Sequence, residues 1–360
     1  MTGSKLINVK VLEKYITECF IKCGVSEEDA IITADVLIES DKRGIASHGV
    51  ARLHRYIDGL KKGIMIPDAQ FEIVKETANT LLVSGNDGLG QPVSFKATKK
   101  LIEKAKTNNI AFATIRNSNH YGVAGYYSSM IQKEDMIGFS MTNSFPLVVP
   151  THGKNALLGT NPIAVAAPSG EEIPFALDMA TSTVPRGKLE VYDRQNKTMP
   201  KAWATGTDGN PETDAGVVLS NLVSKLGGGL LPLGGASQEF GGHKGYGMGL
   251  VVEILTGILS GGAFGPNVYG TPGKPANVCH FIGAININAF LPIDVFKKSM
   301  DSMITTLHNS EKAEGHDRIF IHGEKEHNLK IKQEKEVSIT NTVLNNITEV
   351  GKSLGVKADF

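Results

Sequence analysis

The chain has 360 residues, of which 41% are hydrophobic and 21% charged, a balance typical of a globular protein. Its 37 Lys and Arg residues equal its 37 Asp and Glu residues, so no basic excess indicates a nucleic acid or an anionic membrane as partner. A chain of this length usually needs more than one hydrophobic core, so we expect two or three subdomains.

The three cysteines are too few for a disulfide framework, and the apolar neighbours of Cys19, Cys23 and Cys279 predict buried core residues. The N-terminus lacks the apolar stretch of a secretory signal. The longest apolar run, residues 245–262, is interrupted by Glu253, which favours a buried helix over a membrane span. We therefore expect a protein of the reducing cytoplasm with no membrane partner.

Apolar spacing predicts three helices in the first 60 residues. One covers residues 12–20 and ends at Gly24. The second begins at Ser26, which forms the pattern of a capping box with Asp29. The third spans residues 47–60.

The third predicted helix carries a row of polar residues. Its core face is formed by four apolar residues at helical spacing: Val50, Leu53, Ile57 and Leu60. On another face, His48, Arg52 and Tyr56 follow one another at intervals of four, with Ser47 beside them. An arginine can bind a carboxylate through two hydrogen bonds, a histidine can take a proton from a hydroxyl, and a tyrosine can donate. The row suits a small hydroxy or keto acid; a capped surface helix with a polar face is the alternative.

From about residue 80 the pattern predicts strands alternating with helices. Strands are expected at 80–85, 110–117, 136–144, 159–169 and 174–182, and helices at 92–108 and 122–133. Polar residues gather where strands end, at 117–120, 142–144 and 178–182. Ligands are commonly held at such strand ends.

Several of these polar residues have two interpretations. His120 follows a strand, and Gly122 leaves room for a ligand near the amides of the next helix, but His120 could also be satisfied within the turn. Asp178 could accept hydrogen bonds from ribose hydroxyls, and Thr160 could donate to a substrate oxygen. Alternatively, Asp178 and Thr181 cap the helix that follows.

The last part of the chain is less regular. Turn-forming residues predict long loops over 190–240. A helix is expected at 243–262, where Lys244 could pair with a phosphate or stay solvated. The densely charged stretch 311–336 predicts a solvated face, and residues 344–354 predict a C-terminal helix.

Several standard motifs are absent. No GxGxxG follows a strand and opens a helix, and there is no Walker A, HExxH, paired CxxC or GxSxG motif. The ten histidines lack metal-ligand spacing. A nucleotide site would therefore be of an unusual kind, and no metal site is expected.

Six stretches resemble, in order, the malate/L-lactate dehydrogenase family of the non-Rossmann type: ASHGVARLHRY, RNSNHYGVAGYY, SMTNSFPLVVPTHG, LGTNPIAVAAP, LDMATSTVPRGK and GGHKGYGMGLVVEILTGILSGG. The similarity runs from about residue 5 to residue 330. The family includes malate, sulfolactate and ureidoglycolate dehydrogenases and piperideine-carboxylate reductases. The resemblance implies an oxidoreductase that moves hydride between NAD or NADP and a 2-hydroxy or 2-oxo acid, with malate and oxaloacetate as the expected pair.

The resemblance also implies an α/β (α+β) fold and a homodimer. We expect a helical domain over 1–75, joined by C-terminal helices from about 290–360. Residues 76–289 would form a non-Rossmann NAD(P)-binding and dimerisation domain, built on a mixed, largely antiparallel sheet.

The match assigns roles to individual residues. Ser47 and His48 look like members of the proton-transfer group, and Arg52 looks like the carboxylate clamp. Thr160 looks like a substrate contact. The polar row suggests Tyr56 as a further substrate contact. His120 competes with His48, because ureidoglycolate dehydrogenase-like members assign proton acceptance to the histidine at this place. We favour His48, since it shares a face with Arg52. The expected cofactor contacts are His120, Tyr121, Gly122, Val123, Ala124, Ser144, Asp178, Met179, Ala180, Arg186, Lys244, His316, Arg318, Gly323 and Glu324.

Two residues depart from the family pattern. Lys188 stands where imine-reducing members carry an acidic residue, which argues against piperideine-carboxylate reduction. His322 replaces a proline usual before the Gly-Glu pair, which weakens the cofactor contacts expected there. Ureidoglycolate, sulfolactate or imine chemistry and a catalytically silent metabolite-binding protein remain alternatives, and the sequence does not separate NAD from NADP.

Overall fold

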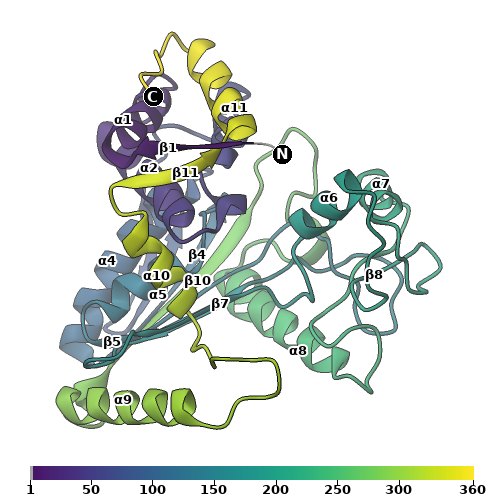
Figure 1. Ribbon diagram of the computed structural model, residues 1–360. Coiled ribbons are helices and arrows are strands. Elements are labelled where there is room, and N and C mark those ends of the chain that lie inside the picture. Colours follow the sequence, from purple (N-terminus) through teal and green to yellow (C-terminus); the bar gives the residue numbers. More distant parts are fainter. Residues whose placement is uncertain (1–2) are drawn as a thin grey trace.

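The computed structural model describes residues 3–360, and its centre is a seven-stranded sheet (Figure 1). In sheet order the strands are β2 (Glu72–Glu76), β3 (Thr80–Ser84), β4 (Ile110–Ser118), β10 (Val278–Asn286), β5 (Met136–Thr142), β6 (Ile163–Ala167) and β7 (Phe175–Met179). Only β3 and β4 pair in parallel; every other neighbouring pair is antiparallel. The expected mixed, largely antiparallel sheet is therefore found.

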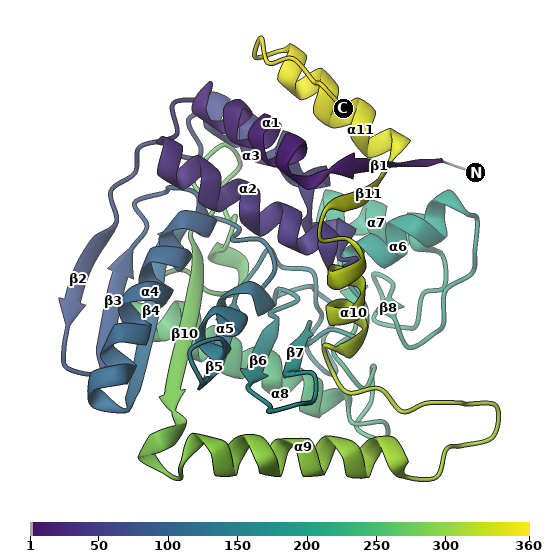
Figure 2. The ribbon, with the colours of Figure 1, turned by 60° about the vertical axis from the view of Figure 1, so that its left-hand side comes forward.

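Helices cover both faces of this sheet. On β10, successive side chains point to opposite faces. Ile282 belongs to the core that the sheet forms with α4 (Gly90–Asn108), whereas Phe281 packs with Val252 of α8 (Gly242–Glu253). The helix α5 (Gly125–Gln132) contacts α4, β5 and β6, and Figure 2 shows α4 and α5 in front of the sheet with α8 behind it.

A second core lies at the N-terminal end of the molecule. It joins the two-stranded sheet of β1 (Ser4–Asn8) and β11 (Glu336–Thr340) to the helices α1 (Val9–Ile21), α2 (Glu27–Lys42), α3 (Leu53–Lys61) and α11 (Asn341–Lys352). Ser26 accepts a hydrogen bond from the Asp29 amide at the start of α2, as the capping pattern predicts. Cys19 and Cys279 are buried, Cys23 is half-buried, and all three are free thiols.

Residues 190–240, predicted as long loops, are in part regular. The helices α6 (Arg186–Arg194) and α7 (Ala215–Ser224) and the short strands β8 (Ala204–Thr205) and β9 (Gly229–Leu230) form a small lobe with its own core. The Asp214 carboxylate accepts a hydrogen bond from the Val217 amide and begins α7. The prediction was wrong there because frequent glycines and prolines hid the buried residues Val218 and Leu222.

After β10 the chain first leads away from the N-terminal core and returns to it at β11 and α11. The turn η5 (Ile287–Ala289) leads into α9 (Ile293–Asn309), whose only buried residue is Ile304, and α9 lies at the end of the molecule opposite α1 and α11 (Figure 1). The charged stretch 311–336, predicted as a solvated face, contains the helix α10 (Glu324–Lys332). No helix within residues 3–360 has the length and apolar character needed to cross a bilayer.

Candidate active site

The predicted helix over 47–60 begins later than expected. Two 3-10 turns, η1 (Ala46–His48) and η2 (Val50–Arg52), precede α3, so Ser47, His48 and Arg52 do not share one α-helical face with Tyr56. The cause is Asp41 at the end of α2, which accepts a 2.7 Å hydrogen bond from the Val50 amide. A Cβ at Gly49 would overlap the Asp41 carboxylate, so only glycine fits there. Burial raises the pKa of Asp41 to about 7.

The double turn organises three of the predicted residues. Ser47 Oγ lies 2.9 Å from Nδ1 of His48, and Arg52 donates from Nε to the Ser47 carbonyl over 2.6 Å. Within residues 3–360, no side chain or carbonyl binds the two terminal nitrogens of Arg52, which are left to receive an anion. The turn thus fixes a guanidinium beside an imidazole without a helix.

His120 comes from the link between β4 and α5 and meets the same turn. Its ring stacks on that of His48 with centroids 5.5 Å apart and 24° between the planes. The Tyr56 hydroxyl lies 2.6 Å from Nδ1 of His120, and the Gly122 amide donates to the same atom over 3.2 Å. Because an amide can only donate, Nδ1 is the acceptor, and the neutral ring carries its proton on Nε2.

Arg55, which sequence reasoning missed, adds a second positive charge. It donates from Nη2 to the Tyr269 hydroxyl over 2.5 Å, and its guanidinium lies 5.4 Å from the centroid of that ring. Burial, together with Arg52 and Arg55, lowers the pKa of His48 to about 4. Burial and the same arginines also hold the pKa of His120 well below its usual range. Both imidazoles are therefore neutral near pH 7.

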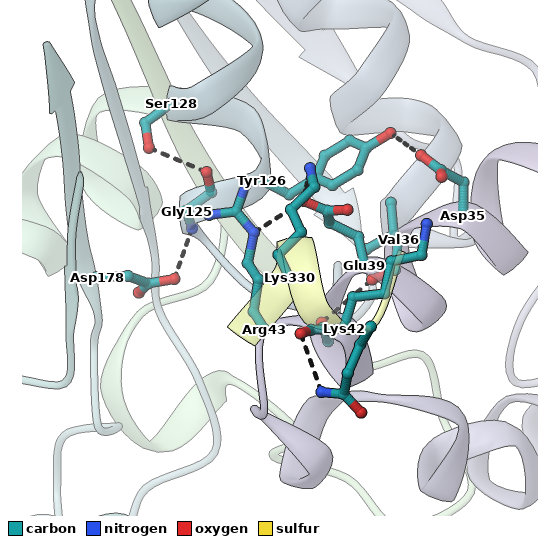
Figure 3. Close-up of polar contacts among 12 residues, drawn as sticks. Asp35, Val36, Glu39, Lys42, Arg43, Gly125, Tyr126, Ser128, Asp178 and Lys330 are labelled. Carbon is teal, nitrogen blue, oxygen red and sulfur yellow. Dashed lines mark hydrogen bonds and ion pairs between the residues drawn. The ribbon is translucent and has the colours of Figure 1, made fainter. Parts of the chain in front are cut away.

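A cleft of about 350 Å³ is lined in part by Val123 and Gly125, which follow His120 in the chain. It lies between the start of α5, the end of β7 and the loop before α10 (Figure 3). Four predicted cofactor residues line the cleft: Val123, Asp178, Met179 and Gly323. The other lining residues are Arg43, Ile45, Gly125, Tyr126, Ala176, Leu177, Phe320, Ile321, His322, Lys325 and Glu326. Its mixture of apolar walls and a few charged groups is typical of a small-molecule site.

Asp178 is the central polar group of this cleft. Its carboxylate accepts a 2.6 Å hydrogen bond from the Gly125 amide, the first residue of α5. Withdrawal from bulk water raises the pKa of Asp178 to about 6, against the opposing effects of the Gly125 amide and Arg43. Figure 3 shows Asp178 and Gly125 facing each other, with Arg43 alongside. The structure does not contain the alternative contact, in which the Asp178 side chain would cap the helix that follows it.

Ser144 and Thr160 come together where β5 ends and β6 is about to begin. Their hydroxyl oxygens lie 3.4 Å apart, and the Thr160 amide donates to Ser144 Oγ over 3.1 Å.

Tyr121 and Ala124 are buried, and Tyr121 stacks on His280 with centroids 4.3 Å apart. Tyr121 and Ala124 therefore anchor the His120 segment in the core.

The remaining predicted cofactor residues lie outside this cleft. Arg186 pairs with Glu190 on α6, and Lys244 is exposed on the first turn of α8. The loop before α10 carries His316, which is exposed, and Arg318, which forms an ion pair with Glu324. The Glu324 carboxylate also accepts from the Ile321 amide, so it fastens this loop. Their contact with a cofactor stays a prediction, as does that of Ala180.

Comparisons with known proteins agree with this architecture. The family model described as malate/L-lactate dehydrogenase matches residues 7–348. The chain is 47% identical to malate dehydrogenase of Pyrococcus abyssi, over 96% of this chain and 94% of the relative. It is 39% identical to malate/(S)-sulfolactate dehydrogenase of Methanothermus fervidus, over 93% and 94% of the two chains. The crystal structure of malate dehydrogenase from Entamoeba histolytica superposes with a TM-score of 0.95 at 36% identity, covering 99% of this chain and 100% of that one. The chain belongs to the malate/L-lactate dehydrogenase family.

Proposed function

We propose that this chain is an NAD(P)-dependent dehydrogenase that interconverts malate and oxaloacetate. The observation that carries the proposal is the stack of two neutral imidazoles, His48 and His120, beside the Arg52 guanidinium. A base, a hydrogen-bond donor and a carboxylate clamp are the groups that oxidation of a 2-hydroxy acid needs. The substrate pair is carried over from the names of the malate dehydrogenase relatives.

The cleft beside the histidines fits a nicotinamide dinucleotide. Asp178 offers a carboxylate to ribose hydroxyls, the start of α5 offers amides, and Arg43 and Lys325 offer positive charge to phosphates. The cofactor supplies the acceptor of the C2 hydride when it is bound. Val123 lines the cleft only three residues after His120, so the cleft and the histidines belong to one site.

Arg52 and Ser47 prepare the substrate for proton transfer. Because the Ser47 carbonyl holds Nε of Arg52, the terminal nitrogens can form two parallel hydrogen bonds with the C1 carboxylate. With Nδ1–H donating to Ser47 Oγ, His48 has a free lone pair on Nε2. The C2 hydroxyl gives its proton to this nitrogen, and the reverse reaction returns the proton to the same oxygen.

His120 has the complementary role. Its Nε2–H donates to the C2 oxygen as the carbonyl forms, while Tyr56 and the Gly122 amide hold the ring through Nδ1. Thr160 supplies a further hydroxyl for the substrate. Substrate binding also neutralises Arg52, which moves the pKa of His48 back towards its ordinary range and makes it a better base.

Absorbance at the NADH band tests the proposed activity. The assay uses four substrates, each with NADH and, in parallel, with NADPH: oxaloacetate, pyruvate, sulfopyruvate and a cyclic imine carboxylate. We expect oxaloacetate to give the highest kcat/KM. Turnover confined to another acid would indicate another reaction of the family, and no turnover with any acid would leave a metabolite-binding protein.

Two histidine variants test the assignment of roles. We expect His48→Gln to lower kcat by about 10²–10⁴-fold and to abolish the acid limb of the pH profile for malate oxidation. His120→Gln should lower kcat but keep that limb. The exposed His54 on α3 provides a control as His54→Gln. If His120→Gln loses the acid limb of the pH profile and His48→Gln keeps it, His120 is the proton acceptor.

We also propose that the chain forms a homodimer through the outer face of α8 and the π-helix η3 (Ile254–Ile258). Exposed large apolar side chains lie there at helical spacing, namely Val251, Ile254, Ile258 and Leu259, and the exposed Phe264 follows in the next loop. Such a patch is typical of an interface, because a monomer seldom leaves a contiguous apolar surface in water. A second copy of the chain can cover the same patch on its partner by two-fold symmetry.

A further inference from the structure

Arg55 is a second cation close to the two histidines and to Arg52. It follows Arg52 by three positions, where η2 runs into α3, so the two guanidinium groups extend from neighbouring turns. Arg55 acts on both histidines of the site, since its charge contributes to the lowered pKa of His48 and of His120. Burial and then the charge of Arg55 lower the pKa of Arg52, against the opposing effects of Tyr56 and Glu190.

Neither guanidinium forms an ion pair within the part of the chain that the structure describes. Within residues 3–360, no carboxylate oxygen lies within 4.0 Å of a side-chain nitrogen of Arg52 or Arg55, although both arginines are only partly exposed. Two close like charges that lack a directly paired counterion repel each other and are costly to withdraw from water. A substrate with one negative charge would balance only one of them.

Tyr269 fixes the position of Arg55. The tyrosine belongs to the segment between η3 and β10, where its amide donates to the Ala276 carbonyl over 2.9 Å and its ring packs edge-on against Phe145. It holds Arg55 both through its hydroxyl and through the face of its ring. Nη2 of Arg55 is used in this contact, while Nη1 and Nε remain able to bind an anion.

We propose that Arg55, positioned by Tyr269, binds the second anionic group of the substrate and so selects 2-hydroxy and 2-oxo acids with two negative charges. This inference rests on the proposed function and narrows its substrate class. Oxaloacetate and malate carry the second charge as a carboxylate, and sulfopyruvate and sulfolactate carry it as a sulfonate. Lactate and pyruvate have only the group that Arg52 binds, so they leave Arg55 without a counterion.

Selectivity is measured as the ratio of kcat/KM for oxaloacetate to that for pyruvate. We expect Arg55→Gln to lower this ratio on the order of 100-fold, the effect of removing one partner of a desolvated charge pair. Arg55→Lys should lower it less, because the charge stays but the planar fork is lost. Tyr269→Phe should raise KM for oxaloacetate more than it changes kcat. Lys62→Gln, which removes an exposed cation at the end of α3, is the matched control and should leave the ratio unchanged.

The outcomes separate this inference from the proposed function. An equal loss with both acids, or no loss with either, in Arg55→Gln would overturn the role of Arg55 even if the enzyme remains a dehydrogenase. If the wild-type protein turns over no acid, calorimetric titration with malate and with lactate still decides the matter. Tighter binding of malate that disappears in Arg55→Gln supports the second anion site, and equal binding of the two acids refutes it.

Discussion

The hydroxyl of Tyr56 lies 2.6 Å from Nδ1 of His120, although 64 positions separate the two residues in the chain. This contact joins α3 to the segment that follows β4, so the orientation of one imidazole depends on the N-terminal core. Tyr56 is itself fully buried among that core's apolar residues. The substrate side of the site is therefore only as well ordered as the packing between these two parts of the chain.

Tyr56→Phe removes this hydrogen bond and keeps the ring. Nδ1 of His120 then retains only the Gly122 amide, so the ring is held less firmly with Nε2 towards the substrate. We expect kcat for oxaloacetate reduction to fall on the order of 10-fold, with KM changed by less than about 3-fold, because the loss is felt in the transition state. Tyr15→Phe, which removes a buried hydroxyl bonded to the Ile347 carbonyl, is the control. A rise in KM alone would assign Tyr56 to ground-state binding instead.

The charge of Arg55 should be visible in the pH dependence of malate oxidation. His48 must be neutral to accept a proton, and its pKa of about 4 in the free protein keeps it neutral down to about pH 5. In Arg55→Gln one of the cations that disfavour the imidazolium is gone, so the pKa rises and kcat/KM declines at a higher pH. Arg55→Lys should keep the wild-type profile. Superimposable acid limbs for Arg55→Gln and Arg55→Lys would show that Arg55 does not act on the proton acceptor.

Asp41 should make the stability of the turn pH-dependent. Burial raises its folded-state pKa to about 7, above the value of about 3.8 expected for an unfolded chain. The stabilisation that comes with its bound proton is complete below the unfolded value and is lost as the pH rises through about 7. Asp41→Asn keeps an acceptor for the Val50 amide and does not ionise, so its stability relative to wild type should increase by up to about 1.4 kcal/mol per pH unit across this window.

Urea unfolding at pH 5 and pH 8 measures this difference. Asp301→Asn is a useful comparison, because three backbone amides lower the pKa of that carboxyl and its pH dependence has the opposite sign. A constant difference between Asp41→Asn and wild type at the two pH values would contradict the raised pKa.

The sequence predicted the elements whose buried residues have a clear period. The core face expected over residues 47–60 is buried at all four positions, one on η2 and three on α3. The elements α4 and β4 lie within a few residues of their predicted limits. The central strand β10 was missed, because its run VCHFIGAIN is buried on both faces and so lacks an alternating pattern. The helix α7 was missed because neighbouring glycines indicated only loops.

The candidate site could be predicted in its residue types but not in its contacts. Ser47, His48 and Arg52 were identified on an expected helix, yet they are held by two 3-10 turns whose cause, the side chain of Asp41, lies on a different helix. The stack of His48 on His120 and the contact of Arg55 with Tyr269 join residues far apart in the chain. Only the folded structure brings such pairs together, since no local period relates them.

The apolar face of α8 and η3 makes a prediction about assembly. Ile258 is 54% exposed and lies between Ile254 and Leu259 on the proposed interface. Ile258→Glu would bury a carboxylate without a partner in the dimer but leave it in water in the monomer, so we expect the dimer to weaken by at least about 100-fold. Sedimentation velocity over a dilution series would follow the change in mass.

Leu6→Glu is the control for this experiment, because it introduces the same charge at an exposed leucine of β1. That strand lies at the other end of the molecule from α8 (Figure 1), so the variant should keep the mass of the wild type. Thermal unfolding shows whether each chain still folds, since a side chain that is half exposed in one copy of the chain contributes little to that copy's own core. A folded Ile258→Glu variant with the mass of the wild-type dimer would exclude this face, and the exposed side of α9, with Val295, Met303 and Leu307, would then be the surface that a second copy covers.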